Sequence, residues 1–136
     1  MIVMNEFHLQ IATPDGLVFD GNAEAILVRT TMGDVEIMRG HADYFATLGI
    51  GRAKLTANGE SREASSSGGF ISVRGGEVKL IATTFEFADE IDLKRALEAK
   101  ERAEALLIKA EDDRAVRMAR AKLSRAINRI SVAERK

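Results

Sequence analysis

Every glycine of this 136-residue chain, and its single proline, lies at or before Gly76. Both residues interrupt helices, whereas tight turns between strands use them. Long uninterrupted helices can therefore form only in the C-terminal part of the chain. The N-terminal part, which holds all 11 glycines, is suited to short elements joined by turns.

The N-terminal part has the period of β-strands. In residues 7–11, apolar and polar side chains alternate, as in a strand with one buried face. Similar runs are separated by turns that contain glycine. The runs are 25–31, 54–56, 69–73 and 78–83, and the turns are 13–16, 58–59 and 75–76. Short strands at this spacing predict an antiparallel sandwich or barrel.

The period changes to that of a helix after Asp89. Apolar residues then recur every three or four positions, in two stripes separated by the acidic residues 111–113. The first stripe comprises Leu93, Ala96, Leu97, Ala103, Leu106, Leu107 and Ala110, and the second comprises Val116, Ala119, Leu123, Ala126, Ile127, Ile130 and Ala133. We predict an antiparallel helical hairpin with Asp113 as the N-cap of a second helix over 114–135.

The chain is thus expected to be an α+β protein in two parts, a β-domain over 1–88 and a helical hairpin over 89–136. The seam of the hairpin is rich in alanine, which buries less apolar area than leucine at about 25 cal/mol per Å². A thin seam and a crowded basic second helix make the hairpin a candidate mobile element. The alternative is a surface hairpin that is docked permanently on the sheet.

Charge is distributed unevenly between the two parts. Residues 1–91 hold 7 Lys and Arg against 13 Asp and Glu, whereas residues 92–136 hold 13 against 8. An acidic body therefore carries a basic tail piece. The tail is expected to meet an acidic partner, which could be protein, nucleotide or nucleic acid.

Several function classes lack their required residues. The chain has no cysteine, its two histidines (His8 and His41) are isolated, and no G-x-x-x-x-G-K-[ST] loop occurs. Residues 1–7 do not have the pattern of a secretory signal, and no apolar run approaches the length of about 18 residues that crosses a bilayer. We expect a non-catalytic protein without a metal or an obligatory cofactor, and without direct membrane insertion.

Two motifs in the β-domain resemble those of the ATP synthase epsilon family. Residues 33–41 (GDVEIMRGH) are similar to its G-x-x-G-I-x-x-G-H segment, and residues 67–70 (SGGF) with Val73 are similar to its S-G-G-F/I-x-x-V run. With TPDG at 13–16 and the alanine-rich hairpin, the resemblance covers essentially the whole chain in order. Glu36 and Asp43 depart from the family, which usually has glycine and proline there, and each alters the loop near His41.

The resemblance implies a β-sandwich and a non-catalytic rotor subunit in the central stalk of a proton- or sodium-translocating F-type ATP synthase. Its partners would be the gamma subunit, the membrane c-ring and the catalytic alpha and beta subunits. The complex would hold the chain peripherally at the cytoplasmic face of the cell membrane. In the family, the loop that contains the matches to Asp34 and His41 faces the membrane ring, so these two residues are the expected ring contacts.

Residues 91–96 (IDLKRA) are similar to the I/L-D-x-x-R-A motif of epsilon subunits that bind ATP. Asp92 could cap a helix or accept from an adenine amino group, and Arg95 could offer a planar donor fork to phosphate. The resemblance implies that ATP is a regulatory ligand of Glu86, Ile91, Asp92, Arg95, Ala96, Arg102, Arg125 and Arg129. The alternative is a solvated surface, in which Glu98 and Arg102 form an ordinary helix pair.

The resemblance also implies a second, extended state in which the basic helix inhibits ATP hydrolysis. Its expected contacts with the catalytic head are Arg114, Arg117, Arg120, Lys122 and Arg125. Two rivals remain at this point, a nucleic-acid-binding module and a free-standing ATP sensor. An isoelectric point of about 6.2 and an aromatic content of 5% argue against nucleic-acid binding.

Overall fold

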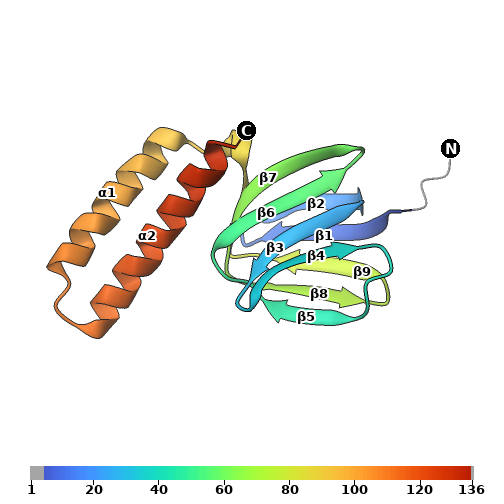
Figure 1. The fold of residues 1–136 in the computed structure, drawn as a ribbon, viewed down its shortest axis with the longest axis horizontal. Coiled ribbons are helices and arrows are strands. Elements are labelled where there is room, and N and C mark those ends of the chain that lie inside the picture. The colour runs from blue at the N-terminus through green and yellow to red at the C-terminus, as the bar shows by residue number, and fades with distance from the viewer. Residues whose placement is uncertain (1–4, 136) are drawn as a thin grey trace.

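The computed structural model describes residues 5–135. Residues 1–4 of the predicted β-domain and residue 136 of the predicted hairpin lie outside the described residues. Ten strands are followed by a short 3₁₀ turn and two helices (Figure 1). The elements are β1 (Phe7–Thr13), β2 (Gly16–Ala23), β3 (Ala25–Thr30), β4 (Gly33–Met38), β5 (Tyr44–Thr47), β6 (Gly51–Ala57), β7 (Glu60–Ser67), β8 (Phe70–Arg74), β9 (Glu77–Ile81), β10 (Thr84–Phe87), η1 (Ala88–Glu90), α1 (Leu93–Lys109) and α2 (Asp113–Ala133).

The strands form two five-stranded sheets that pack face to face. Their orders are β2-β1-β9-β8-β5 and β10-β7-β6-β3-β4. All strand pairs are antiparallel except β1 with β9, which run parallel. The two helices extend from one end of this sandwich as an antiparallel hairpin (Figure 1). The predicted fold class, a β-sandwich followed by a helical hairpin, is confirmed.

The alternating residues of the strands fill the space between the sheets. Leu9, Ile11, Ile26, Ile37, Ile71 and Leu80 are completely buried there. One glycine is required where the turn between β7 and β8 passes the end of β9. Gly69 has a φ of +87°, and a Cβ on it would lie 1.8 Å from the carbonyl oxygen of Ile81. Only glycine allows the backbones to approach this closely.

The sequence analysis missed five strands: β2, β4, β5, β7 and β10. The segment with Asp34 was taken for part of a loop, and this is wrong, because Asp34 lies in β4, where Val35 and Ile37 alternate with polar residues. β7 was missed because its C-terminal half reads as polar. The three serines that end β7, Ser65–Ser67, are nevertheless buried.

The N-cap of α2 is Asp112 and not Asp113. Asp112 has extended backbone angles, and its carboxylate accepts a hydrogen bond of 2.7 Å from the backbone N–H of Ala115. Asp113 already has helical geometry and forms the first residue of the helix. Both aspartates suit a cap, and the choice between them depends on where the connecting loop ends.

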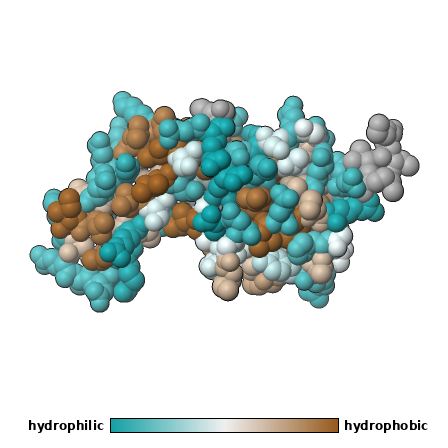
Figure 2. Space-filling view, viewed as in Figure 1, coloured by the Kyte–Doolittle hydropathy of each residue, from teal (hydrophilic) through white to brown (hydrophobic). Residues whose placement is uncertain are grey.

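The hairpin buries small residues and leaves several large ones exposed. Ala96 and Ala103 of α1 are buried, as are Ala119, Ala126, Val132 and Ala133 of α2. Leu97, Leu106 and Ile127 of the predicted stripes are each 45–47% exposed. Figure 2 shows apolar residues along the visible face of the hairpin. None of the described helices is long and apolar enough to cross a membrane.

The connection between sandwich and hairpin is held by polar contacts around η1. Glu90 accepts from the backbone N–H of Phe87 at 3.1 Å. Arg62 of β7 lies over the ring of Phe87, 3.6 Å from its centroid, and also contacts Asp89 at 3.4 Å. After η1, Ile91 is buried against Ala96 and the end of α2. These contacts define where the hairpin leaves the sandwich.

Candidate functional site

A cavity of about 550 Å³ lies where the hairpin meets the outer face of the second sheet. α1, α2, β7, β10 and the residue before β6 contribute to its walls. The lining residues are Ile50, Ser65, Ser67, Thr84, Glu86, Ala99, Arg102, Ala103, Leu106, Lys122, Arg125, Ala126 and Arg129. The helices thus supply both apolar and cationic side chains, and the sheet supplies mainly polar ones; mixed linings of this kind are common in binding pockets for small molecules.

Positive charge dominates the cavity. Arg102, Lys122, Arg125 and Arg129 all line it, against the single carboxylate of Glu86. Arg129 forms an ion pair with Glu86, with its Nε 2.7 Å and an Nη 3.3 Å from the two carboxylate oxygens. The other three cations have no ion pair with any residue of the described part. The arrangement favours a small anion with several charges.

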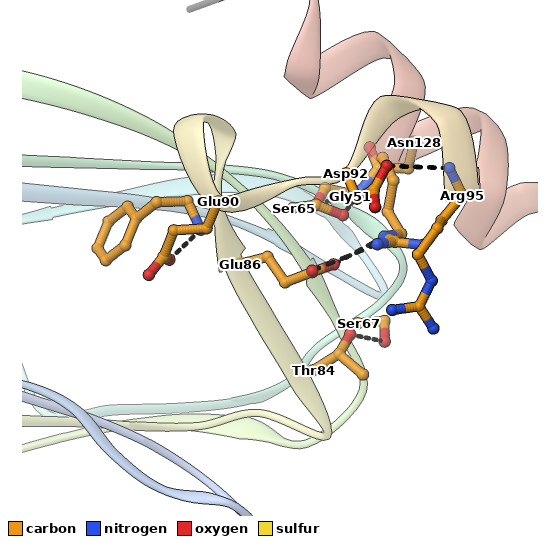
Figure 3. A network of polar contacts seen from close by, with 11 residues as sticks. Gly51, Ser65, Ser67, Thr84, Glu86, Glu90, Asp92, Arg95 and Asn128 are labelled. Carbon is orange, nitrogen blue, oxygen red and sulfur yellow. Dashed lines mark hydrogen bonds and ion pairs between the residues drawn. The ribbon is translucent and has the colours of Figure 1, made fainter. Parts of the chain in front are cut away.

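The sheet wall of the cavity presents hydroxyl groups and one carboxylate (Figure 3). Ser67 at the end of β7 is hydrogen-bonded to Thr84 at the start of β10. Two residues further along β10, Glu86 points toward α2 and meets the Arg129 guanidinium. Because alternate residues of a strand face the same side, Thr84 and Glu86 both reach the cavity.

The structure brings together four of the eight residues predicted to bind ATP: Glu86, Arg102, Arg125 and Arg129. The other four lie at the start of α1, outside the cavity lining. Asp92 is the N-cap of that helix and accepts from the backbone N–H of Arg95 at 3.2 Å (Figure 3). Ile91 and Ala96 are buried in the small cluster between η1 and the end of α2.

The five residues predicted to contact the catalytic head are divided between two environments. Arg114, Arg117 and Arg120 are exposed along the first half of α2. Lys122, which is also exposed, and Arg125, which is half-buried, line the cavity. The prediction placed Lys122 only in the inhibitory set, and its position in the cavity was not foreseen.

The two residues predicted to contact the membrane ring are not adjacent. Asp34 lies at the start of β4, paired with Arg29 at 2.5 Å, and this guanidinium holds the pKa of the Asp34 carboxyl below its usual range. His41 follows the other end of β4, where its Nδ1 donates to the carbonyl of Ala42 at 2.7 Å. Asp34 and Met38 are four residues apart in β4, which corresponds to about 13 Å, and His41 lies beyond Met38.

Sequence reasoning missed Asn128, which connects α2 to the sandwich. Its Nδ2 donates to the backbone carbonyl of Gly51 at 2.9 Å and to Oγ of Ser65 at 2.8 Å. The only signal in the sequence was an amide beside the apolar stripe of α2, one position before Arg129. Without the partner strand, that amide could not be distinguished from a solvated surface residue.

A second polar cluster lies far from the cavity, on the outer face of the first sheet. The two ring nitrogens of His8 each lie 2.6 Å from a carboxylate oxygen, one of Asp20 and one of Glu77. These hydrogen bonds, first that with Glu77 and then that with Asp20, raise the pKa of His8. The bond to His8 in turn lowers the pKa of Asp20. The described residues contain no group that could hold a metal ion.

Comparison with known proteins identifies the family of both parts. Residues 6–88 match the model of the ATP synthase delta/epsilon chain β-sandwich domain, and residues 89–134 match that of its long α-helix domain. The ATP synthase epsilon chain of Bacillus velezensis is 43% identical over 130 residues, which are 96% of this chain and 98% of that one. The ATP synthase epsilon chain of Ruminococcus albus is 40% identical over 135 residues, 98% and 100% of the two chains.

A solved structure has the same fold. A chain in the structure of Euglena gracilis mitochondrial ATP synthase superposes with a TM-score of 0.76 at 23% identity, over 88% of this chain and 76% of that one. At this identity the likeness concerns the fold alone. Both family models and the sequence relatives show that this chain belongs to the ATP synthase delta/epsilon chain family, as a non-catalytic subunit of the bacterial F-type epsilon kind.

Proposed function

We propose that this chain is a central-stalk subunit that couples the catalytic head of an ATP synthase to its membrane ring, and that its hairpin is a regulatory element controlled by ATP. The observation that supports the ATP site best is the cationic cavity between hairpin and sandwich. Three of its cations lack an ionic partner among the described residues; they come together from α1 and α2, and the docked sandwich closes the cavity beside them.

ATP matches the chemistry of this cavity. Its phosphates would be held by Arg102, Lys122 and Arg125, which can donate charge-assisted hydrogen bonds. Its base and ribose would lie against the apolar side chains of α1 and toward the start of that helix, where Asp92 and Arg95 lie. An anion would also relieve the repulsion between the three unpaired cations. Bound ATP therefore stabilises the docked hairpin.

In the second state the hairpin opens and α2 reaches the catalytic head. Arg114, Arg117 and Arg120 are already exposed, whereas Lys122 and Arg125 face the cavity. Because the same two cations serve both states, ATP and the catalytic head compete for them. Plentiful ATP would then hold the hairpin docked and relieve inhibition, by binding one state more tightly than the other.

The remaining contacts are assigned to the sandwich. Asp34 and His41, at the two ends of β4, would meet the polar loops of the membrane ring, and other surfaces of the sandwich would meet the gamma subunit. The chain would be peripheral at the cytoplasmic face of the membrane. Replacing Asp34 and His41 by alanine together should lower the amount of this chain that co-purifies with the ring, and unchanged recovery would refute the assignment.

Calorimetric titration of the purified chain with ATP and with ADP tests the site. We expect saturable binding that prefers ATP. Arg102→Ala should raise the Kd for ATP by about 10- to 100-fold, because a hydrogen bond to a charged group contributes about 1.5–3 kcal/mol. Arg117→Ala removes an exposed arginine of α2 outside the cavity and is the matched control. An equal loss of ATP affinity in the two variants would mean that binding depends only on the net charge of the hairpin.

Arg95→Ala distinguishes two poses of the ligand. If ATP extends from the cavity to the start of α1, this variant also weakens binding, although Arg95 does not line the cavity. If ATP stays within the cavity, its affinity is unchanged. No heat with wild-type chain up to millimolar ATP would refute the nucleotide site altogether.

Inhibition is tested in the assembled enzyme by deleting residues 89–136. Hydrolysis should rise, and it should rise most at low ATP, where the hairpin is expected to be extended. Equal hydrolysis by the full-length and truncated assemblies at both low and high ATP would refute the inhibitory role.

A further inference from the structure

The docked hairpin is joined to the sandwich by few polar contacts. The two helices pack along each other, and α2 contacts β6, β7 and η1, with Val132 and Ala133 near its end buried in the cluster at η1. Among the described residues, the side-chain hydrogen bonds between the hairpin and the strands come from two neighbouring residues, Asn128 and Arg129. Docking therefore depends on few interactions.

Asn128 makes an unusually complete contact. The two hydrogens of its Nδ2 have two acceptors on different strands, the Gly51 carbonyl at the start of β6 and the Ser65 hydroxyl in β7. Ser65 is only 6% exposed beneath the helix. A side chain that donates to two strands at once fixes both the distance and the rotation of the helix on the sheet.

The rotation of α2 determines which of its side chains enter the cavity. Successive residues of a helix are about 100° apart, so Arg125, Asn128 and Arg129 lie within about 100° of one another. When Asn128 is bonded to the sheet, the two arginines are directed at the cavity, where both are found. A rotation or lift of α2 that broke the Asn128 bonds would withdraw them.

We infer that Asn128 is the docking latch of the hairpin and the positioning residue of the cavity. It does not line the cavity itself, but it keeps Arg125 and Arg129 directed into the cavity, where they could bind an anion. This second part rests on the proposed ATP function, whereas the latch itself does not. In the open state, water can replace Asn128 at both acceptors, so each bond contributes modestly and the latch is reversible.

The test measures docking directly and without nucleotide. The chain has no cysteine, so Glu60→Cys on the sandwich and Lys109→Cys at the far end of α1 can carry spin labels, both at exposed positions. Asn128→Asp keeps the shape of the side chain but removes both donor hydrogens. We expect the ratio of docked to open chains, read from the distance distribution, to fall about tenfold.

Two controls separate a latch from a general loss of structure. Ser124→Asp adds the same charge to an exposed position one turn away on α2 and should leave docking unchanged. Ser65→Ala removes one of the two acceptors. Because Ser65→Ala and Asn128→Ala act on the same contact, the double variant should lower the ratio of docked to open chains by less than the product of the two single effects. Circular dichroism should show the same helix content in all variants.

The readouts decide the two claims independently. An unchanged docked population in Asn128→Asp and Asn128→Ala overturns the latch. The latch is also overturned if the effects of Asn128→Ala and Ser65→Ala on the docked-to-open ratio simply multiply in the double variant. If Asn128 positions the cavity, the apparent Kd for ATP should rise in proportion as the docked fraction falls. Saturating ATP should then restore docking. A loss of docking without any change in Kd overturns that role. If wild type binds no ATP, the proposed function fails while the docking measurement still tests the latch.

Discussion

Between its sheets the sandwich buries large aliphatic side chains completely, whereas the hairpin buries mainly alanine and joins the sandwich by a few polar contacts. Leu9, Ile26 and Leu80 have no exposed surface. In the hairpin, Leu97 and Ile127 remain nearly half exposed. The difference indicates two scales of stability in one chain, a sandwich that unfolds as a unit and a hairpin that can leave it at small cost.

The largest effect is expected when the same substitution, leucine to alanine, is made in each of the two regions. Leu80→Ala should lower the free energy of unfolding by about 2–5 kcal/mol, because it leaves a cavity among completely buried side chains. Leu97→Ala, at a 45% exposed site, should change it far less. Urea unfolding followed by circular dichroism measures both. Similar losses would contradict the separation into two scales.

The next effect concerns the thin seam of the hairpin. Ala103 is 1% exposed between α1 and α2. Ala103→Leu should push the helices apart and destabilise the hairpin by about 1–3 kcal/mol, while the sandwich keeps its stability. Hydrogen exchange by residue distinguishes the two regions. Slower exchange in the hairpin would instead mean that the seam has room for a larger side chain.

A smaller effect is expected at the start of α2. Asp112→Ala removes the N-cap and should destabilise the hairpin by about 1 kcal/mol, with no change in the sandwich. Asp113→Ala is the matched control, since Asp113 is the first helical residue and caps nothing. If Asp113→Ala had the larger effect, the N-cap would have been assigned to the wrong residue.

The smallest effect concerns a surface contact of the sandwich and its pH dependence. The raised pKa of His8 means that its contacts stabilise the fold fully below its ordinary value of 6.5 and are lost as pH rises through the raised value. The pKa of Asp20 is lowered from 3.8, so at acid pH its stabilising contact with His8 is lost as the carboxyl protonates. The wild-type advantage in Tm over His8→Gln should therefore be present near pH 5.5 and disappear in alkaline solution.

The other histidine is the control for that measurement. His41 contacts the carbonyl of Ala42 and has no ion pair in the described part of the chain. His41→Gln makes the same replacement outside the surface cluster, so a change in Tm that both variants share does not come from the contacts of His8. A His8→Gln variant whose Tm runs parallel to wild type across the range would show that the surface cluster is not coupled to folding.

The sequence was sufficient for features that depend on local period and turn chemistry. The alternation at 7–11 and the glycine turns predicted an antiparallel sandwich or barrel, of which the family resemblance selected the sandwich, and the helical stripes predicted both helices. β7 is not predicted because its last three residues, Ser65–Ser67, are polar although all three are buried; Ser65 lies against Asn128 of α2, and Ser67 is bonded to Thr84 of β10. Their burial is a tertiary property that no local pattern contains.

The candidate site was predicted in part for a similar reason. Arg125 and Arg129 are four residues apart and therefore share one face of α2, and both line the cavity. Of the two predicted ATP-binding arginines on α1, Arg95 and Arg102, only Arg102 lines the cavity. The positions of Lys122 and Asn128 depend on how the hairpin rotates against the sheet, which the spacing of residues within one helix does not fix.

The parallel pairing of β1 with β9 has a consequence for the order in which the chain is completed. Residues 9–12 pair with residues 78–81, so the first strand has no neighbour on that side until almost the whole sandwich has been synthesised. Such a closure between distant segments is slow compared with local hairpin formation. The hairpin docks on the second sheet, whose strand pairs are all antiparallel, so the surface that receives the helices does not wait for this closure.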